Sequence, residues 1–599
     1  MFNLAGNKKA IFIILMIMLL TTITCVSAVE DNSKLHKNET VSVTNPTSNN
    51  PTEPNSPTYN SISDNPSTDN PITTHTISKE KLNKSVKTED NDIFVLNQSN
   101  INNYKKYEFP DNSYILFEES VENIYIDITH KNITITGNEG VVLKNSHIEV
   151  FDGGTLYKIS NLTFEVNDSA KYPQTLMLET DNSTIENLVF NEFREAANYR
   201  NFYRSINVDG NNNTIINCTF NITSPSKTIN WDTYAAECNF ETIVIHGDHN
   251  KILNNTLTIT ENINNRDFPF GTIFGISVRG NYNTIDNNDL RMDGTLYLYG
   301  IRIYYSNNTV TNNYVEVNSV RYANGIAIES PTSGSTGDNI LRNNTVIVTT
   351  TDGEVPGEPP MVGLPTNVVY AIMVTEYRYV GAGLYTGEQS NTVNNVIEGN
   401  NIYGSSIQAY GVEFFGSKDT VISNNNIAVE GVSAMGIVGG GAGTRISGNI
   451  MDVYGQTSEA FPSADWYKPQ TSGVSLRQGS DALITGNEIT TNHGPAVITE
   501  QESGTVISEN YIDVQNNDVV VNVKNPEGLV EIVENAITNL ADRIITGGEA
   551  SGNYETTPKE PGEFVIPVRN STDNQDTDNN DADNNSTDND NTDTPVSNS

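Results

Sequence analysis

Apolar and polar residues alternate along most of this chain, and an Asn-rich corner recurs between short apolar stretches. A typical copy is Ile-Asp-Asn-Asn-Asp-Leu at 285–290: apolar, any residue, Asn or Gly, Asn, any residue, apolar. Further clear copies start at Ile135, Ile252, Val310, Leu341, Ile397, Ile422, Ile446, Ile484, Ile507 and Ile532, and looser ones at Ile159, Ile185 and Ile215. Many starts lie 23 to 25 residues apart, and the longer intervals fit the same repeat with inserted loops. This spacing predicts a solenoid.

In most coils a second apolar strand, which begins with Gly or Ala, precedes the corner by nine to eleven residues. Its copies begin at Gly275, Gly300, Gly325, Gly411 and Gly473, with a variant at Ala371. Together the motifs give about three short strands per repeat, which predicts an all-β, single-stranded, right-handed parallel β-helix of about fifteen coils. Neither the Gly- and Asp-rich nonapeptides of a β-roll nor a Leu-rich consensus is present.

The corner residues predict a ladder of stacked amides. Asn and Gly tolerate the left-handed backbone that a sharp corner needs. Amides stacked at the spacing of neighbouring strands, about 4.8 Å, can then bond from coil to coil. The expected rungs are Asn138, Asn255, Asn288, Asn313, Asn344, Asn400, Asn425, Asn449, Asn487, Asn510 and Asn535. Leu162, Leu188 and Cys218 replace Asn in the early copies, so the ladder should be interrupted there.

The chain divides into five segments. Residues 1–28 have the order of a signal peptide, with Lys8 and Lys9, an apolar run and Val-Ser-Ala at 26–28. An uncleaved anchor is the alternative. Residues 29–92 are expected to be a disordered Asn/Ser/Thr/Pro linker, 93–130 an N-terminal cap with the first strands, 131–550 the β-helix, and 551–599 a disordered acidic tail.

Composition and charge restrict the classes of partner that this protein is expected to bind. The formal net charge of −40 argues against nucleic acid and anionic membranes, and membrane insertion is not expected after signal cleavage. Cys218 and Cys238 could form a disulfide or remain two thiols. Several Asn-x-Ser/Thr sequons are present, so glycosylation of exposed ones is plausible in an exported protein. No cofactor is expected; Ca²⁺ is conceivable, but no motif supports it.

The outward side of the Gly-led strands is the expected site. Alternation places two outward columns there. One contains Asp209, His246, Arg279, Tyr304 and Glu329, and the other contains Arg302 and Glu413. These groups could perform acid–base chemistry on sugars, with His246, Arg279 and Tyr304 as weak catalytic candidates. A solvated strand face with a few ion pairs is the alternative.

Long insertions emerge on one side of the predicted rod. They cover 191–204, 221–241, 260–274, 349–370 and 454–472. They carry Trp231, Tyr234 and Trp466, whose rings could stack on sugars beside Asp209, Arg302, Glu329 and Glu413. Arg279 and Arg302 would give such a groove local positive charge for a uronate carboxylate. In a lyase, Arg279 or His246 would abstract a proton and Tyr304 would donate one.

The coils resemble the adhesin-like right-handed β-helix proteins of methanogenic archaea and, more broadly, pectin-lyase-like repeats. The resemblance rests on the export signal, the linker, Asn-Ile-Thr-Ile-Thr-Gly-Asn at 132–138 and Asn-Asn-Thr-Ile-Ile-Asn-Cys-Thr-Phe at 212–220. It implies an exported, carbohydrate- or protein-binding fold and carries over no catalytic residue. Immunoglobulin-like repeats and a wall-binding module are not found, which leaves the mode of attachment open.

These observations favour a secreted or cell-surface adhesin-like protein that binds an extracellular glycan or surface protein without catalysis. A polysaccharide lyase or glycoside hydrolase that uses the β-helix groove is the alternative. A structural envelope spacer is the third reading. Exposed aromatic residues would favour a binder, and converging ionisable groups would favour an enzyme. The absence of both features would favour a spacer.

Overall fold

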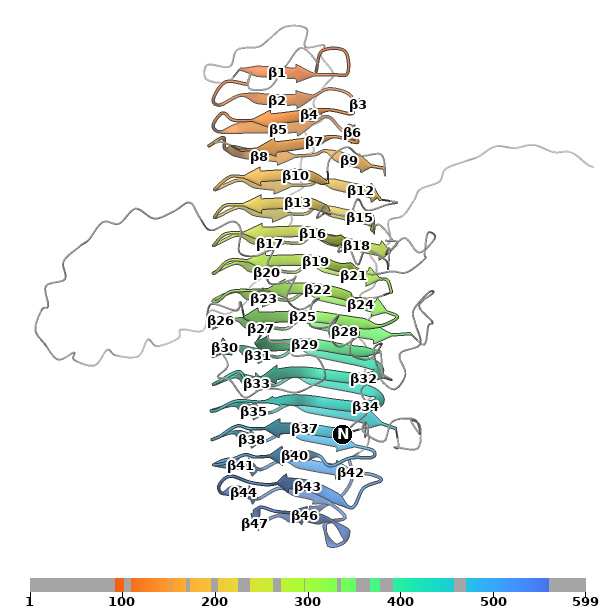
Figure 1. The fold of residues 1–599 in the computed structure, drawn as a ribbon, viewed down its shortest axis with the longest axis vertical. Coiled ribbons are helices and arrows are strands. Elements are labelled where there is room, and N and C mark those ends of the chain that lie inside the picture. The colour runs from red at the N-terminus through yellow and green to blue at the C-terminus, as the bar shows by residue number, and fades with distance from the viewer. Residues whose placement is uncertain are drawn as a thin grey trace, which may run out of the picture. The chain divides into compact units, whose positions relative to one another are not determined.

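The computed structural model describes residues 92–101, 109–151, 153–167, 173–194, 203–224, 238–261, 271–295, 297–330, 336–351, 367–376, 392–456 and 470–559. Within them, strands stack in chain order and every ladder between named strands is parallel, for example β17 with β20 and β20 with β23 (Figure 1). The predicted parallel β-helix is therefore confirmed. Leu540–Asp542 form the 3-10 turn η4, and no helix of the described residues is long and apolar enough to cross a membrane.

Short strands at the Asn corner form the corner sheet. It contains 17 strands: β1 (Ile93–Leu96), β2 (Tyr114–Phe117), β5 (Ile133–Gly137), β8 (Leu156–Ser160), β11 (Thr184–Glu186), β14 (Thr214–Ile216), β17 (Lys251–Leu253), β20 (Thr284–Asp286), β23 (Thr309–Thr311), β27 (Ile340–Arg342), β31 (Val396–Glu398), β33 (Val421–Ser423), β35 (Arg445–Ser447), β38 (Leu483–Thr485), β41 (Thr505–Ser508), β44 (Val530–Val533) and β47 (Glu549–Ser551). β1 and β2, in the expected cap region, already pair in this sheet.

A second stack follows the corner. Its strands are β3 (Val121–Glu122), β6 (Val142–Lys144), β9 (Thr163–Val166), β12 (Val189–Phe193), β15 (Thr219–Ser224), β18 (Thr256–Glu261), β21 (Asp289–Asp293), β24 (Tyr314–Ser319), β28 (Thr345–Thr350), β36 (Ile450–Gly455), β39 (Glu488–Thr491), β42 (Tyr511–Val514), β45 (Ala536–Thr538) and β48 (Tyr554–Thr556). The final strand lies beyond residue 550, where the sequence repeat fades.

The Gly-led strands form the third stack. They are β4 (Tyr125–Ile128), β7 (His147–Val150), β10 (Gln174–Glu179), β13 (Tyr203–Asp209), β16 (Cys238–His246), β19 (Gly271–Arg279), β22 (Tyr297–Ile303), β25 (Tyr322–Ser330), β29 (Val368–Glu376), β37 (Thr471–Arg477), β40 (Val497–Glu500), β43 (Val519–Lys524) and β46 (Ile544–Thr546). The long strands β32 (Asn401–Phe415) and β34 (Asn426–Gly440) run through both stacks and join them into one 29-stranded sheet. A small sheet pairs β26 (Thr336–Gly337) with β30 (Thr392–Val393).

Apolar side chains fill the interior of the coils. Ile285, Val310, Ile422 and Ile484 are fully buried, as the alternation predicts. Phe190 stacks on its neighbours Phe164 and Phe220 inside the core, with ring centroids 5.1 and 4.7 Å apart. Each inward residue meets its equivalent in the coils on either side, so the core is continuous along the stack.

The predicted Asn ladder is present from Asn255 onward. In each rung the side-chain oxygen accepts bonds of 2.9–3.0 Å from the backbone and side-chain nitrogens of the preceding rung, as Asn425 does from Asn400. Asn553 extends the ladder by one rung, because it accepts both bonds from Asn535 at 2.9 Å. Before Asn255 the ladder is interrupted, and Cys218 is a buried free thiol whose backbone N–H donates to Asn255.

Asn138 was expected to be a rung, and this prediction is wrong. Its side chain is exposed and donates to the carbonyl of Glu118 at 3.3 Å. A Cβ on the preceding Gly137 would lie 2.6 Å from Leu162, so the apolar side chain of the next coil fills the space inside this corner. The polar residue is therefore turned outward.

A second, unpredicted Asn ladder lies at the start of the corner strands. Its rungs are Asn213, Asn250, Asn283, Asn308, Asn339 and Asn395, all buried. Each backbone N–H donates to the side-chain oxygen of the next rung, at 2.8–3.2 Å. From β17 to β31, each corner strand is therefore flanked by two ladders, which together fix the register between coils.

Candidate functional site

The strands β13, β16, β19, β22, β25, β29 and β32 carry the predicted polar columns on their outer side, here called the site face. Asp209 pairs with His246 and His246 with Arg279, as the alternation predicts. The second column places Arg302 beside Ser277 and, three coils further on, Glu413 beside Met373. The structure thus brings most of the predicted site residues into neighbouring coils.

A chain of hydrogen bonds links three of these coils. His246 Nδ1 lies 2.5 Å from Asp209 Oδ1, and His246 Nε2 lies 3.1 Å from an Arg279 nitrogen. A carboxylate only accepts and a guanidinium only donates, so His246 carries its proton on Nδ1 and accepts at Nε2. Arg279 also donates to Glu241 Oε1 at 2.8 Å. The lone pair that a histidine base would use is therefore occupied by Arg279.

Glu241 is the buried acid at the centre of the site face. It is 1% exposed, and Arg204 donates to its second oxygen at 2.9 Å. Burial alone would raise the pKa of this carboxyl, but the charges of Arg279 and Arg204 outweigh burial and lower it. Glu241 is therefore held ionised and is unsuited to act as a general acid.

The lowered pKa predicts a specific loss of stability in acid. A carboxyl whose pKa is depressed by folding contributes stability above its usual value, here 4.5, and loses that contribution as the pH falls further. Glu241→Gln should therefore flatten the decline of the urea unfolding midpoint below about pH 4.5. Glu555→Gln, at an exposed position, is the control and should follow the wild type. Parallel curves for Glu241→Gln and the wild type would contradict this assignment.

Arg302 forms the second buried ion pair of the site face. Its Nε and one terminal nitrogen donate to Glu329 Oε2 at 2.9 and 2.6 Å. Its guanidinium also lies over the rings of Tyr304 and Phe274, at 4.3 and 4.7 Å from their centroids. Burial would lower the pKa of Arg302, but the charge of Glu329 outweighs it and raises the pKa. The guanidinium expected to meet a uronate is thus already neutralised by a carboxylate.

Aromatic rings follow the same strands. Their members are Phe274, Tyr299, Tyr322, Tyr370 and Tyr410, here called the aromatic row. Neighbouring centroids lie 5.0 to 5.7 Å apart, which is close to the spacing between coils. Tyr299, Tyr322, Tyr370 and Tyr410 are partly exposed, whereas Phe274 is buried. Burial raises the pKa of Tyr322 well above its ordinary value, so its phenol stays protonated.

The sequence prediction omitted part of this face. Arg204, Glu241, Phe274 and Tyr299 occupy one outward column, three positions before the predicted Asn207 column. Strict alternation carried three residues back from that column predicts inward positions, so sequence reasoning missed them; the burial pattern of β13 breaks the alternation between Arg204 and Asn207. Glu413 is 7% exposed, and Trp231, Tyr234 and Trp466 lie outside the described residues. In the part of the chain that the structure describes, no group of three or more His, Cys, Asp or Glu is placed to hold a metal ion.

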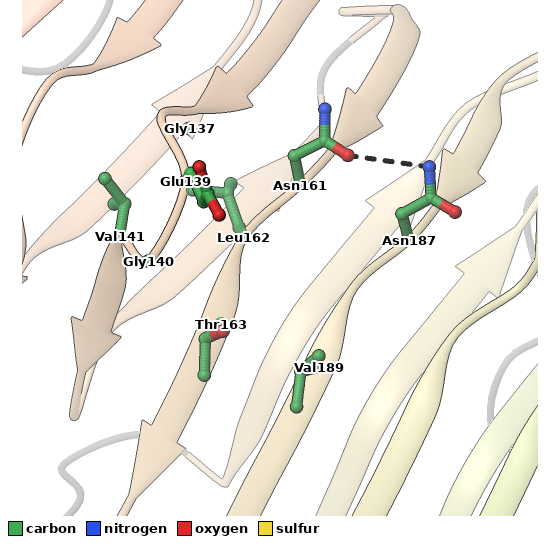
Figure 2. Close-up of a pocket in the computed structure, with 9 residues that line it drawn as sticks. All are labelled: Gly137, Glu139, Gly140, Val141, Asn161, Leu162, Thr163, Asn187 and Val189. Atoms are coloured by element: carbon green, nitrogen blue, oxygen red, sulfur yellow. Dashed lines mark hydrogen bonds between the residues drawn. The ribbon is translucent and has the colours of Figure 1, made fainter. Parts of the chain in front are cut away.

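A pocket of about 330 Å³ lies elsewhere, at the corner where the ladder is interrupted. Figure 2 shows Leu162 and the two amides Asn161 and Asn187 at its edge, with the Asn187 side chain donating to Asn161 at 3.5 Å. Glu139 is its one ionisable lining residue. The pocket contains none of the predicted site residues, and it lacks the converging groups that chemistry on a substrate requires.

Comparisons with known proteins agree on the fold. The family model of the right handed beta helix region matches residues 380–557. No curated protein matches the chain at a significant level. The fold is thus a right-handed parallel β-helix.

Solved structures resemble the chain over most of its length. The A-module of mannuronan C-5 epimerase AlgE6 from Azotobacter vinelandii is 14% identical, with a TM-score of 0.32, over 75% of this chain and 91% of that one. The tailspike protein of E. coli bacteriophage HK620 in complex with pentasaccharide is 11% identical, with a TM-score of 0.39, over 70% and 69%. At these values the likeness concerns the β-helix alone, and no residue role is transferred from it.

Proposed function

We propose that this protein binds an extended, neutral glycan along the site face and does not act on it chemically. The proposal rests on the aromatic row, which runs from β19 to β32. The charged side chains beside this row are already paired with one another. Partly exposed Tyr rings and phenol groups recur at about the coil spacing of 4.8 Å, so successive sugar rings could meet successive coils. Ring contacts and hydroxyl bonds need no net charge on the ligand.

The pairing of charges supports binding over catalysis. Glu241 accepts from two arginines, Glu329 accepts from Arg302, and His246 is bonded at both ring nitrogens. A general acid or base needs a proton or a lone pair that it can exchange with the substrate, whereas the oxygens and ring nitrogens of these groups are already bonded to their partners. The overall charge of −40 likewise favours a neutral glycan over a polyuronate.

The proposed setting is the cell envelope. A signal peptide at 1–28, the polar linker at 29–92 and the adhesin-like resemblance support export and a role at the surface, with a glycan or a surface protein as partner. Sequencing the N-terminus of the native protein tests the export step. A mature chain that still begins at Met1 and remains in the cytoplasm would contradict it.

Binding is tested with the full chain on an array of neutral hexasaccharides and hexauronates, followed by calorimetry on the tightest binder. Tyr299→Ala should weaken binding by about tenfold, because it removes a stacking ring from the middle of the aromatic row. Tyr299→Phe keeps the ring and should lose less. Tyr157→Ala is the matched control, since Tyr157 is 61% exposed on β8 of the corner sheet. Equal losses in Tyr299→Ala and Tyr157→Ala, or no binding by the wild type, would refute the proposal.

A carbohydrate lyase is the second candidate, favoured by one observation. Asp209 and His246 are hydrogen-bonded and partly exposed, at 38% and 31% of their side-chain surfaces, and the Arg279 guanidinium lies 5.6 Å from the Tyr304 ring. If Arg279 moved away, His246 Nε2 could accept a proton. Incubation with uronate polymers, with and without Ca²⁺, should then give an unsaturated product that His246→Ala abolishes. Absence of that product in the wild type removes this candidate.

A further inference from the structure

Most corner strands are preceded, by one or two residues, by a residue with a left-handed backbone, and these residues form a row along the stack, here called the left-handed row. Twelve members are Asn, Asp or Gly: Asn112, Asn132, Asn182, Asn212, Asn307, Asp338, Asn394, Asp419, Gly443, Asp481, Gly504 and Gly547. Two neighbouring coils depart from this rule. They carry His249 with a φ of 60° and Tyr282 with a φ of 58°.

A tyrosine is costly at this position. The left-handed region crowds the Cβ of any L-residue; Gly, Asn, Asp and His are found there most often, whereas bulky residues such as Tyr282 are outliers. The coil nevertheless holds both residues there, because the His249 N–H donates to the carbonyl of Asn281 at 3.0 Å and the Tyr282 N–H to that of Ser306 at 3.3 Å. Backbone strain of this kind persists where the surrounding structure enforces it, and it is often found at binding sites.

The strain brings two rings together in solvent. The His249 and Tyr282 rings are nearly parallel, at 8°, with centroids 4.9 Å apart. Both side chains are exposed, and Tyr282 has 53% of its surface accessible. The buried stack of Phe190 and Phe220 gains stability from leaving water, whereas this exposed stack gains much less. Its neighbours in the row, Asn212 and Asn307, are shorter, which leaves the outer faces of the pair open.

The His249–Tyr282 pair lies next to the end of the site face. His249 follows His246 by three residues, and Tyr282 follows Arg279 by three, on the same two coils. Polar groups lie next to both rings along the chain: Asp248 Oδ1 accepts from the backbone and side-chain nitrogens of Asn281, at 2.6 and 3.2 Å. Carboxylate and amide groups beside an aromatic face are the chemistry that holds a sugar by its hydroxyls and its ring.

We propose that His249 and Tyr282 form a subsite for one pyranose ring of the glycan that the site face binds. The inference rests on the proposed function and extends it around the corner of coils β16–β17 and β19–β20. The sugar ring stacks on an outer face of the aromatic pair, and its hydroxyl groups bond to Asp248 and Asn281.

The test replaces the two aromatic residues with the residue that dominates the row. In His249→Asn and Tyr282→Asn, the hexasaccharide that binds the full chain most tightly on the array should bind about tenfold more weakly by calorimetry. The thermal unfolding midpoint should stay the same or rise, because Asn relieves the left-handed strain. Asp419→Asn, at another exposed position of the row, is the matched control and should change neither value.

Two results would overturn the subsite. Unchanged affinity in Tyr282→Asn, while Tyr299→Ala still loses affinity, removes the subsite and leaves the proposed glycan binding intact. A lowered unfolding midpoint with unchanged affinity assigns the pair to stabilising the coil instead. If Tyr299→Ala and Tyr282→Asn both bind like the wild type, glycan binding at the site face and the subsite fail together.

Discussion

Replacing Glu329 with Leu should destabilise the β-helix by about 3–5 kcal/mol, the usual cost of leaving a buried charge without its partner. The Glu329 side chain is 3% exposed and that of Arg302 is 12% exposed. Glu329 Oε2 accepts both donors of the pair, and Arg302 lies under the Tyr304 ring. Without the carboxylate, the guanidinium would remain among rings and apolar strands without the acid that binds it directly.

A double variant separates the cost of leaving Arg302 without its partner from the net contribution of the ion pair to stability. Arg302→Met combined with Glu329→Leu removes both charges and keeps similar volumes, so it should recover most of the lost stability. Urea unfolding of the full chain at neutral pH measures all variants. Arg342→Met is a matched control, because its pair with Glu398 is exposed at 47% and 34% and should cost about 1 kcal/mol or less. A Glu329→Leu variant as stable as the control would mean that water reaches Arg302.

The fold could be predicted from the sequence because every coil repeats the same local pattern of apolar, polar and corner residues. Alternation sets which side chains point inward, and the Asn or Gly of the corner sets where the chain turns. Asn287 and Asn312, with φ values of 55° and 57°, occupy the left-handed region that this reasoning requires. Strand pairing then follows from stacking equal coils, so the columns of Asp209, His246 and Arg279 came out in the predicted register.

Local rules failed where a residue's environment is set by another coil. Asn138 matches the motif, yet Leu162 from the following coil fills the corner, and nothing in the motif itself reports this. The second ladder is visible in the sequence as Asn five residues before the main rungs from Asn255 to Asn400, as Asn283 is before Asn288. Sequence alone does not distinguish these residues from the Asn that is common in turns. Ladder bonds depend on contacts between coils, which only the assembled stack provides.

The ion pairs of the site face could not be predicted from the two outward columns of residues. Arg279 and Arg302 looked like free cations for a ligand, because their own columns contain no acid directly beside them. Their partners come from elsewhere. Glu241 lies five positions before His246, the register partner of Arg279, and Glu329 lies two positions after Ala327, the register partner of Arg302. Long side chains cross columns, so alternation predicts where a residue starts and not where its charged end binds.

Replacing Asn425 with Ala should destabilise the protein by about 1–3 kcal/mol, as a single rung removed from the middle of the ladder. Asn425 is 1% exposed. Its oxygen accepts two bonds from Asn400, and its amide donates to Ile397 and Asn449 at 2.9 Å. Alanine would leave the two Asn400 donors and the Ile397 carbonyl buried without a partner.

Adding an amide to the ladder should have the opposite effect and stabilise the protein. Cys218→Asn places an amide at the first interrupted position, where the backbone already donates to Asn255 Oδ1 at 2.9 Å and the thiol lies 3.8 Å from the carbonyl of Ile185. The added side chain can donate to both, so stability should rise by about 1 kcal/mol. Asn424→Gly, at the exposed left-handed residue beside Asn425, is the control and should change little. Urea unfolding distinguishes the three, and equal effects of Asn425→Ala and Asn424→Gly would show that the ladder amides add nothing beyond the shape of the corner.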